Sequence, residues 1–205
     1  MSTALSTAET LPLVVPYQPA RLSVADYHKM IADGSLTENR RLELLKGVMV
    51  EKMTTNPDHA AIIRRIQRLF YQMLPENYWL RIQSPITLRD SEPEPDLAIV
   101  RPDELELKRH PGPADVLQVI EVSSSSLLTD RYKAEIYAEA GIPWYWIVNL
   151  AARRVEVYSQ PLATTDGLRY GPPRIYEVGE VIPVILDGLE VGTIAAEQLL
   201  PTVAG

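Results

Sequence analysis

The chain has 205 residues, of which 46% are hydrophobic and 23% charged, and these proportions are ordinary for a globular protein. It contains no cysteine, which excludes disulfide bonds and zinc sites built from thiolates, and its apolar stretches are all shorter than the ~18–20 residues that a membrane-spanning helix needs. The net charge of −7 argues against a protein that coats nucleic acid through bulk positive charge, but it is compatible with an enzyme that gathers acids around a metal ion.

Residues 1–20 are rich in Pro, Ala, Thr and Ser and show no hydrophobic periodicity. They predict a flexible or loosely docked arm. This segment also lacks a basic stretch followed by an apolar core, which is the pattern of a secretory signal, so a cytoplasmic location is expected. Residues 21–205 show no internal repeat and no linker, and they predict a single domain.

The first half of that domain alternates helix and strand signals. Ser23 is a good N-cap for a helix over residues 24–32. Residues 41–53 predict two strands that reverse direction at Lys46 and Gly47. The remaining signals of this half predict a helix that begins at Asn56-Pro57 and extends to about Met73, and strands at 78–83, 86–88, 96–100 and 116–122.

The second half begins with a helical segment. A helix is expected from about residue 130 to 140, because Gly141 and Pro143 then end it. The aromatic run 144–148 predicts a strand. The later signals predict strands at 153–158 and 169–178, joined by a loop at 164–167, and a final helix over 193–200. Helices interleaved with strands in this way predict an α/β fold with a central mixed sheet flanked by helices.

Two acids stand out because each accompanies a strand that is expected to be buried. Asp96 follows Pro95 at the start of the apolar run 97–100, whereas Glu121 interrupts the run 116–122. A carboxylate inside a central strand is costly unless a cation or hydrogen-bond donors meet it. Two such acids on neighbouring strands are able to hold Mg²⁺ against a phosphodiester. The ordinary alternatives are a turn residue for Asp96 and a strand-end acid that reaches solvent for Glu121.

Lys133 supplies an amine close to these acids. On the expected helix it shares a face with Ile136, Tyr137 and Ala140, so it heads an apolar stripe. It also lies near the expected helix N-terminus, where the helix dipole disfavours a cation. A lysine that breaks two local rules is typical of a functional site, although a lysine can also extend along an apolar surface to reach water.

Further positions carry weaker signals. Glu43 alternates with Leu42 and Leu44, so it points away from them and by itself indicates an exposed strand acid. His59 shares a helical face with apolar residues, which favours a core-edge histidine over a catalytic base. Arginines cluster on the opposite face of that helix, which is typical of a solvated surface but is also compatible with steering a phosphate backbone. They are Arg64, Arg65 and Arg68.

The chain resembles a known family, the Uma-type restriction-endonuclease family of the PD-(D/E)XK nuclease superfamily. The similarity is carried by Glu43, Pro95-Asp96, Glu121-Val122-Ser123 and the segment 130–148, Asp-Arg-Tyr-Lys-Ala-Glu-Ile-Tyr-Ala-Glu-Ala-Gly-Ile-Pro-Trp-Tyr-Trp-Ile-Val. It spans roughly residues 23–158, and residues 133–148 are its most specific part.

The resemblance implies a restriction-endonuclease-like fold and cleavage of DNA that depends on Mg²⁺, with Mn²⁺ able to replace it. It implies that Asp96 and Glu121 are metal ligands, assisted by the Val122 carbonyl, and that Glu43 is an additional acid at the metal. A homodimer is also expected. The resemblance offers His59 and Gln83 as substrate contacts. Ser123 is a further candidate from the sequence itself, because the polar run 123–126 can contact phosphate through its amides and hydroxyls, although a plain helix-capping loop explains that run equally well.

One position departs from the family's pattern. The usual Glu-x-Lys motif places lysine at position 123, where this chain has Ser123. The resemblance includes migration of that amine to the following helix, which Lys133 satisfies. The predicted catalytic residues are therefore Glu43, Asp96, Glu121 and Lys133.

Two functions are open on these grounds. The first is a metal-dependent endonuclease, whose mechanism needs no covalent enzyme intermediate and therefore no cysteine. The second is a non-catalytic nucleic-acid-binding or interaction protein on a degenerate nuclease scaffold, which the acidic charge and the missing Glu-x-Lys lysine favour. The retained acids and Lys133 favour the enzyme, and RNA and branched DNA stay open as substrates.

Overall fold

The computed structural model describes residues 20–36, 42–52, 56–102 and 109–201. Apart from Ala20, the arm expected over residues 1–20 lies outside the described residues, as do both ends of the strand pair expected over 41–53. Within the described ranges, no helix is both long and apolar enough to cross a membrane.

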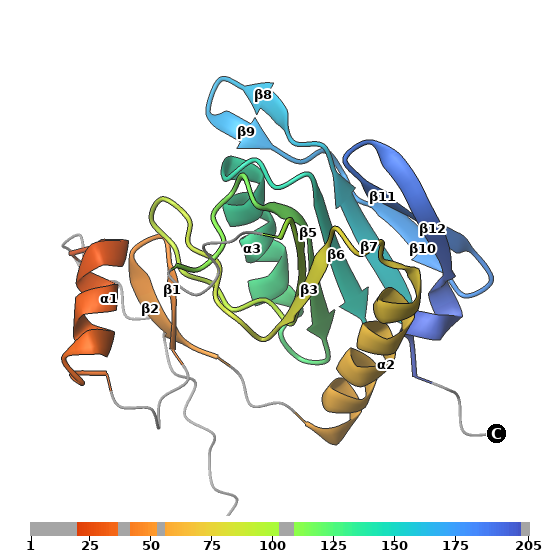
Figure 1. The fold of residues 1–205 in the computed structure, drawn as a ribbon, viewed down its shortest axis with the longest axis horizontal. Coiled ribbons are helices and arrows are strands. Elements are labelled where there is room, and N and C mark those ends of the chain that lie inside the picture. The colour runs from red at the N-terminus through yellow and green to blue at the C-terminus, as the bar shows by residue number, and fades with distance from the viewer. Residues whose placement is uncertain (1–19, 37–41, 53–55, 103–108, 202–205) are drawn as a thin grey trace, which may run out of the picture.

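A six-stranded mixed sheet forms the centre of the fold (Figure 1). Its strand order is β10-β7-β6-β5-β4-β3, and β5 and β6 are its parallel pair. The helix α3 (Leu127–Glu139) connects these two strands as the crossover that a parallel pair requires. The six strands are β3 (Trp79–Ile82), β4 (Leu97–Val100), β5 (Val116–Ser123), β6 (Trp144–Asn149), β7 (Arg154–Ser159) and β10 (Arg174–Glu177). The predicted α/β class with a mixed sheet and flanking helices is confirmed.

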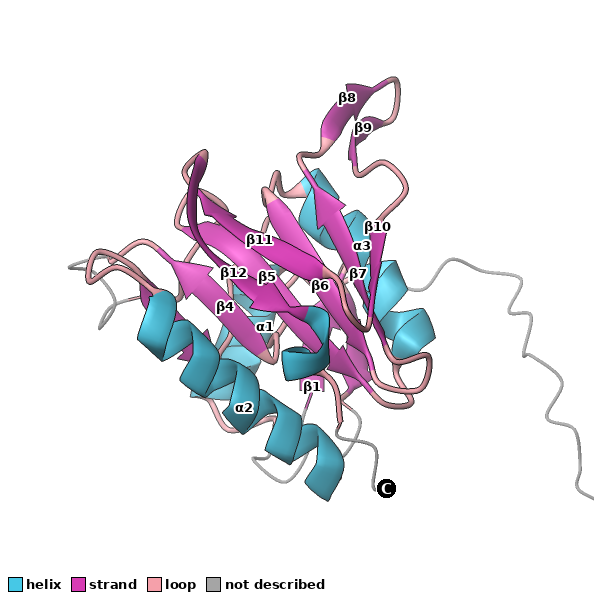
Figure 2. Cartoon of the chain, turned by 90° about the vertical axis from the view of Figure 1, so that its right-hand side faces the viewer, coloured by secondary structure: helices cyan, strands magenta, loops and turns pink. Residues whose placement is uncertain are grey.

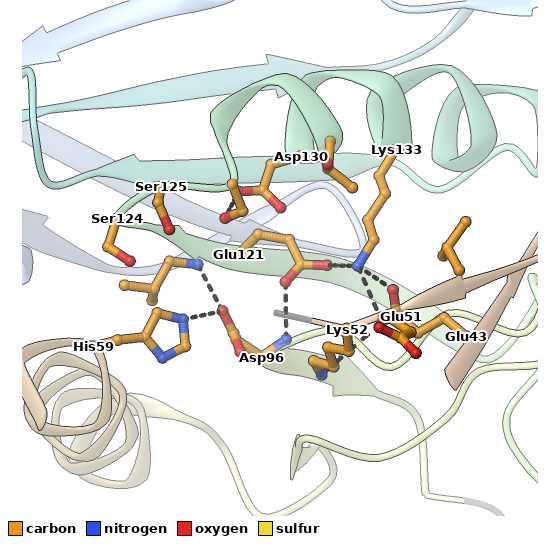
Figure 3. A pocket seen from close by; sticks show the side chains of 14 residues that line it. Glu43, Glu51, Lys52, His59, Asp96, Glu121, Ser124, Ser125, Asp130 and Lys133 are labelled. Carbon is orange, nitrogen blue, oxygen red and sulfur yellow. Dashed lines mark hydrogen bonds and ion pairs between the residues drawn. The ribbon is translucent and has the colours of Figure 1, made fainter. Parts of the chain in front are cut away.

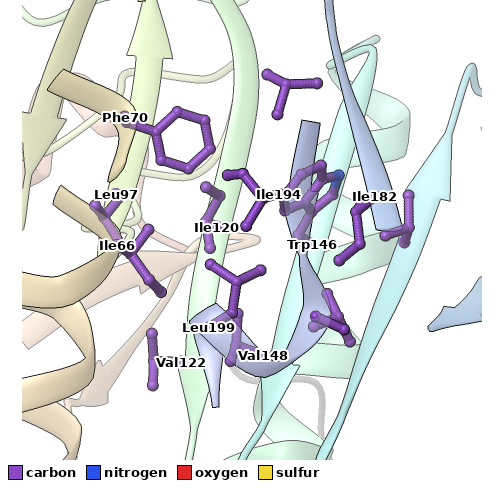
Figure 4. Close-up of a cluster of buried hydrophobic side chains, with 14 of the residues drawn as sticks. Ile66, Phe70, Leu97, Ile120, Val122, Trp146, Val148, Ile182, Ile194 and Leu199 are labelled. Carbon is purple, nitrogen blue, oxygen red and sulfur yellow. The ribbon is translucent and has the colours of Figure 1, made fainter. Parts of the chain in front are cut away.

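One face of the sheet packs against α2 (Pro57–Met73) and the C-terminal elements (Figure 2). The C-terminal elements are the hairpin β11–β12 (Val181–Leu186 and Leu189–Ala195) and the 3₁₀ turn η1 (Ala196–Leu199). The cluster buried between these layers includes Ile66, Phe70, Ile120, Trp146 and Leu199 (Figure 4). Burial of this apolar surface is the main source of stability for this layer.

The other face of the sheet lies under α3, and the alternation of β5 decides which side chains reach it. Ile120 and Val122 point into the cluster beneath α2, whereas Val119 belongs to the cluster beneath α3. Successive strand residues point to opposite faces, so Glu121 points toward α3. The fold therefore directs a carboxylate, rather than an aliphatic side chain, into this layer.

The two N-terminal helices begin where the sequence predicts. Ser23 caps α1 (Val24–Ala32), and its hydroxyl accepts a hydrogen bond from the Asp26 N–H at 3.1 Å. Asn56 caps α2, and its side chain accepts a hydrogen bond from the His59 N–H at 2.8 Å. Each cap satisfies an N–H that the first helical turn leaves without an intrahelical partner.

The predicted reversal at Lys46 and Gly47 is also confirmed. β1 (Leu42–Leu45) and β2 (Val48–Glu51) form an antiparallel two-stranded sheet. Lys46 and Gly47 have φ angles of 48° and 74°, which are typical of a type I′ hairpin turn.

Residues 86–88 were expected to form a strand, and this prediction is wrong. The Leu88 N–H donates to the Ser91 carbonyl at 2.9 Å, and the Ile86 N–H donates to the Pro93 carbonyl at 3.0 Å. The segment thus closes a local loop instead of joining the sheet. Its apolar side chains are still buried, which explains why the sequence pattern resembles a strand.

The C-terminal part contains more strands than the sequence predicts. Residues 193–195, expected to begin a helix, end β12, and up to residue 201, where the described part of the chain ends, the short η1 turn is the only helical element that follows them. The predicted pairing of the late strands holds for β7 and β10. In the sequence, a small hairpin of β8 (Leu162–Thr164) and β9 (Gly167–Arg169) lies between these two strands. It extends away from the sheet (Figure 1). Asp187 and Gly188, with φ angles of 50° and 79°, form the turn of β11–β12, and Asp-Gly is a local hairpin signal that the predicted elements did not use.

Candidate active site

The register of the sheet brings Asp96 and Glu121 together. β4 and β5 are antiparallel and pair Leu97 with Ile120, so the residue before Leu97 lies beside the residue after Ile120. The Asp96 N–H donates to Glu121 Oε2 at 3.2 Å, and the Val122 N–H donates to Asp96 Oδ2 at 2.9 Å. Both acids are buried, and both line the same cavity (Figure 3).

Lys133 joins Glu121 to an acid from β1. Its Nζ lies 3.0 Å from Glu121 Oε1 and 2.9 Å from Glu43 Oε2 (Figure 3). Glu43 is buried rather than exposed, so the interpretation from its strand pattern alone is wrong. The reason is tertiary, because β1 packs beside the segment that leads into β4, where the Glu94 N–H donates to Glu43 Oε1 at 2.9 Å.

The position of Lys133 on its helix differs from the expectation. α3 begins at Leu127 rather than near residue 130, so Lys133 lies in the second turn and the argument from the helix dipole fails. The argument from burial holds, because Lys133 is 4% exposed and shares a buried face with Ile136 and Tyr137. The Tyr137 hydroxyl donates to Glu121 Oε1 at 3.2 Å and so completes the surroundings of that carboxylate.

These side chains line a cavity of about 170 Å³. It is bordered by β1 and β2, by the N-terminal end of α2 and by the first turns of α3 (Figure 3). Carboxylates outnumber ammonium groups in its lining, which concentrates negative charge and attracts cations. The carboxylates are Glu43, Glu51, Asp96, Glu121 and Asp130, the lysines are Lys52 and Lys133, and hydroxyls come from Ser124, Ser125, Ser126 and Thr129.

A sequence model of the Uma2 family, described as "Putative restriction endonuclease", matches residues 24–196. The chain belongs to the Uma2 family. The resemblance seen in the sequence is thereby confirmed. No curated protein matches the chain.

A solved structure supports the fold of this Uma2 protein. It is the crystal structure of "a putative nuclease belonging to DUF820" from Anabaena variabilis ATCC 29413. The TM-score is 0.57 at 16% sequence identity, over 77% of this chain and 88% of that chain. At this identity the likeness shows a shared fold.

Restriction-endonuclease-like families generally use divalent metal ions, and the Uma2 cavity offers the oxygen donors that Mg²⁺ prefers. Within the described residues, the hydrogen bonds to the Asp96 carboxylate both go to Oδ2, so Oδ1 keeps its lone pairs. In the same ranges, no three His, Asp or Glu side chains are already arranged as a set of metal ligands. Lys133 Nζ lies between Glu43 and Glu121 instead. Within the described residues, Asp96 Oδ1 is therefore the oxygen of this pair that is open to a divalent cation, whereas both oxygens of Glu121 already accept hydrogen bonds.

The titration behaviour of the cavity reflects its surplus of acids. Burial raises the pKa of Glu121 to about 8 against the attraction of Lys133, and repulsion from Asp96, Asp130 and Glu43 contributes to the rise. Burial alone would lower the pKa of Lys133, but Glu121 and Glu43 raise it above its ordinary value. The two ammonium groups therefore do not balance the five carboxylates that line the cavity, and a further cation would lower the pKa of Glu121.

His59 lies in the cavity lining and pairs with Asp96. Its Nε2 is 2.9 Å from Asp96 Oδ2. Burial lowers the pKa of His59, but the hydrogen bond and the charge of Asp96 outweigh burial and raise it. Burial raises the pKa of Asp96, but His59 and the Val122 N–H lower it below its ordinary value. The sequence favoured a core-edge histidine, whereas the structure places the ring against an acid of the site.

The other two predicted substrate contacts lie less directly on the cavity. Gln83 follows β3 and its backbone N–H donates to the Asp96 carbonyl at 3.1 Å, but it is not among the described residues that line the cavity. Ser123 is buried within β5. Its neighbours Ser124 and Ser125 line the cavity in its place (Figure 3).

Sequence reasoning missed three charged residues of the cavity, Glu51, Lys52 and Asp130. Asp130 is buried and accepts a hydrogen bond from Ser126 Oγ at 2.6 Å, and burial raises its pKa. Its spacing of three residues from Lys133 places both on one helix face, which is the signal that was available. Lys52 follows β2, and its Nζ lies 3.9 Å from Glu43 Oε1. No local pattern distinguishes this lysine, because its position depends on how the β1–β2 hairpin docks.

Proposed function

We propose that this protein is a metal-dependent endonuclease that hydrolyses phosphodiester bonds of DNA. The observation that carries the proposal is the convergence of Glu43, Asp96, Glu121 and Lys133 on one cavity from four separate parts of the fold. Membership of the Uma2 family supports it. A site with buried acids in excess of ammonium groups suits a cation-dependent reaction on an anionic substrate.

In this proposal Asp96 and Glu121 hold Mg²⁺, or Mn²⁺ in its place, and Glu43 is the additional acid. When bound, the ion lowers the pKa of a coordinated water and offsets negative charge on the phosphate. Lys133 is anchored by Glu43 and Glu121, so its ammonium group has a fixed position from which it stabilises charge that develops on the phosphate. His59 orients the Asp96 carboxylate through their hydrogen bond.

Nicking of supercoiled DNA in Mg²⁺ or Mn²⁺ tests these roles. Glu121→Gln and Lys133→Ala are expected to slow nicking by about 10²–10³-fold, as loss of a charge-stabilising group at a reacting centre does. Glu135→Gln is the matched control, because Glu135 lies on the same helix as Lys133 with a side chain that is 54% exposed. Equal residual nicking by wild type, Glu121→Gln and Lys133→Ala would reject the assignment.

The second candidate is a non-catalytic nucleic-acid-binding protein on this scaffold. It is favoured by the ion pairs of Lys133, which engage oxygens of Glu43 and Glu121 that a metal would need. Calorimetric titration with Mg²⁺ separates the two functions. No heat of metal binding, together with intact DNA binding, would favour the binder.

A cleavage panel of single-stranded, duplex and branched DNA and RNA then identifies the substrate. We expect cleavage of DNA, and preferential cleavage of RNA would contradict this part of the proposal. The homodimer stays a prediction, and sedimentation velocity measures it directly.

A further inference from the structure

The outer face of α2 carries a line of exposed residues that the cavity does not use. Ala61, Arg64, Arg68 and Tyr71 recur every three or four positions, so they lie on one face of the helix, and all four are exposed. We call these four residues the outer stripe. Within the described part of the chain, neither Arg64 nor Arg68 has an ion pair or a side-chain hydrogen bond. The stripe begins within one turn of His59, which lines the cavity.

The outer stripe ends at an aromatic groove. Tyr71 and Trp79 are 60% and 38% exposed, and they line a groove of about 380 Å³ between the end of α2 and the edge strand β3, together with Leu74, Pro75 and Tyr78. Exposed aromatic side chains gathered in a groove mark a binding surface. Flat aromatic faces of this kind stack with nucleobases irrespective of sequence.

The charge of this region is opposite to that of the whole chain. The chain has a net charge of −7, yet arginines outnumber acids on α2 and around the groove. The arginines are Arg64, Arg65, Arg68 and Arg81, and the acids are Asp58 and Glu76. A phosphate backbone is the partner that such a local excess of arginine complements, because binding draws on Lys and Arg at the phosphates.

Building on the proposed nuclease function, we propose that the outer stripe and the aromatic groove bind a single-stranded DNA segment that flanks the cleavage site. Arg64 and Arg68 contact its phosphates, and an unpaired base stacks on Tyr71 and Trp79. A blunt duplex does not meet this requirement, because its bases are already paired and stacked. The substrate that this surface favours over fully duplex DNA is therefore DNA with a single-stranded extension or branch.

The dimensions of the stripe agree with this occupant. From Ala61 to Tyr71 the helix rises about 15 Å, at about 1.5 Å per residue. That length matches about four nucleotides of a DNA strand, at about 3.4 Å each. A short extension leaving the cavity can therefore reach the groove.

We call the outer stripe and the aromatic groove together the track. Fluorescence anisotropy in EDTA measures DNA binding to the track without cleavage. The probes are a labelled duplex with a short single-stranded tail and the same duplex with blunt ends. Tyr71→Ala/Trp79→Ala is expected to weaken binding of the tailed duplex by about 5- to 150-fold and to leave the blunt duplex unchanged, because stacking of one base contributes that much. Arg64→Gln/Arg68→Gln is expected to reduce the slope of log affinity against log salt for the tailed duplex by about 1.4, the value for two phosphates of a single strand.

Arg89→Gln is the matched control, because Arg89 is 85% exposed and lies outside the stripe. Tailed-duplex affinities that agree between wild type and both double variants would overturn the proposal, and so would a wild type that does not bind the tailed duplex. An equal loss for tailed and blunt duplexes would overturn the single-stranded assignment. Tighter binding of an RNA tail than of a DNA tail would overturn the choice of DNA.

The same variants separate this inference from the proposed function. None of the four substituted residues lines the cavity, so DNA binding by the variants reports on the track and cleavage by the wild type in Mg²⁺ reports on the nuclease. Cleavage by wild type combined with unchanged binding by the variants would reject the track and keep the nuclease. Tail-specific binding combined with no cleavage would reject the nuclease and keep the track.

Discussion

The buried ammonium of Lys133 provides the sharpest test of how the cavity is held together. We consider Lys133→Met, which keeps a long apolar side chain and removes the charge. In the wild type, Nζ lies within 3.0 Å of both Glu43 and Glu121, and all three side chains are almost fully buried. At a pH above the Glu121 pKa of about 8, which is the condition for this test, removing one partner of such a group leaves carboxylates in a medium that solvates them poorly.

The magnitude follows from that geometry. Breaking a buried ion pair by removing one partner costs about 3–5 kcal/mol of unfolding free energy. For a protein of this size, that cost lowers the midpoint of thermal unfolding by about 6–20 °C. Part of the loss should be recovered in Lys133→Met/Glu121→Gln, because the second substitution removes one of the stranded charges. We expect an interaction energy of about 0.5–3 kcal/mol between the two sites.

Urea unfolding in EDTA, followed by tryptophan fluorescence and circular dichroism, measures both quantities. Lys29→Met is the control, because Lys29 is an exposed lysine of α1 and such surface changes stay within about 0.5 kcal/mol. A cost for Lys133→Met as small as that of the control would refute the reasoning. A double variant that is no more stable than Lys133→Met would show that Glu121 is not the charge that Lys133 compensates.

Two further predictions concern residues outside the cavity. Glu156→Gln should cost about 1–3 kcal/mol at pH 7, because the buried Glu156 loses its ion pair with Arg131 at 2.7 Å. Burial raises the pKa of Glu156, but Arg131 lowers it below its ordinary value of 4.5. The stability that wild type gains over Glu156→Gln is therefore present above that value and is lost as the pH falls through the lowered folded-state pKa. A difference in unfolding free energy that stays undiminished in urea titrations at strongly acid pH would contradict this. Gly47→Ala should lower the midpoint of thermal unfolding more than Gly34→Ala. Both glycines have a φ of 74°, so alanine at either position costs about 1–2 kcal/mol of backbone strain. Of the two, only at Gly47 does an added Cβ crowd a neighbour, Arg21 Cβ at 2.7 Å. Equal midpoints for the two variants would show that crowding contributes nothing.

Local signals in the sequence were sufficient where the determining interactions are local. The caps Ser23 and Asn56 bond to N–H groups three residues away, and the turn at Lys46-Gly47 needs only residues that accept positive φ. These features place the first two helices and the first hairpin. The β11–β12 hairpin was missed even though Asp187-Gly188, with φ angles of 50° and 79°, is a typical local signal for its two-residue turn.

The chemistry of the site divides in the same way. A carboxylate at Glu121 and an amine at Lys133, each inside an apolar pattern, are visible in the sequence because burial of a charge conflicts with its neighbours' hydrophobicity. Their mutual contact, and that of Lys133 with Glu43, required β1, β5 and α3 to pack together.

The amino-acid sequence by itself thus determined the fold class, through periodicity and caps, and pointed to the family through the motif residues Asp96 and Glu121 and the segment 130–148. Only the tertiary structure decided that Glu43 is buried, that His59 bonds to Asp96, and that Asp130 and Lys52 join the cavity. The physical reason is that these interactions span segments far apart in the chain. Their energies depend on distance and burial in space, which spacing along the sequence does not specify.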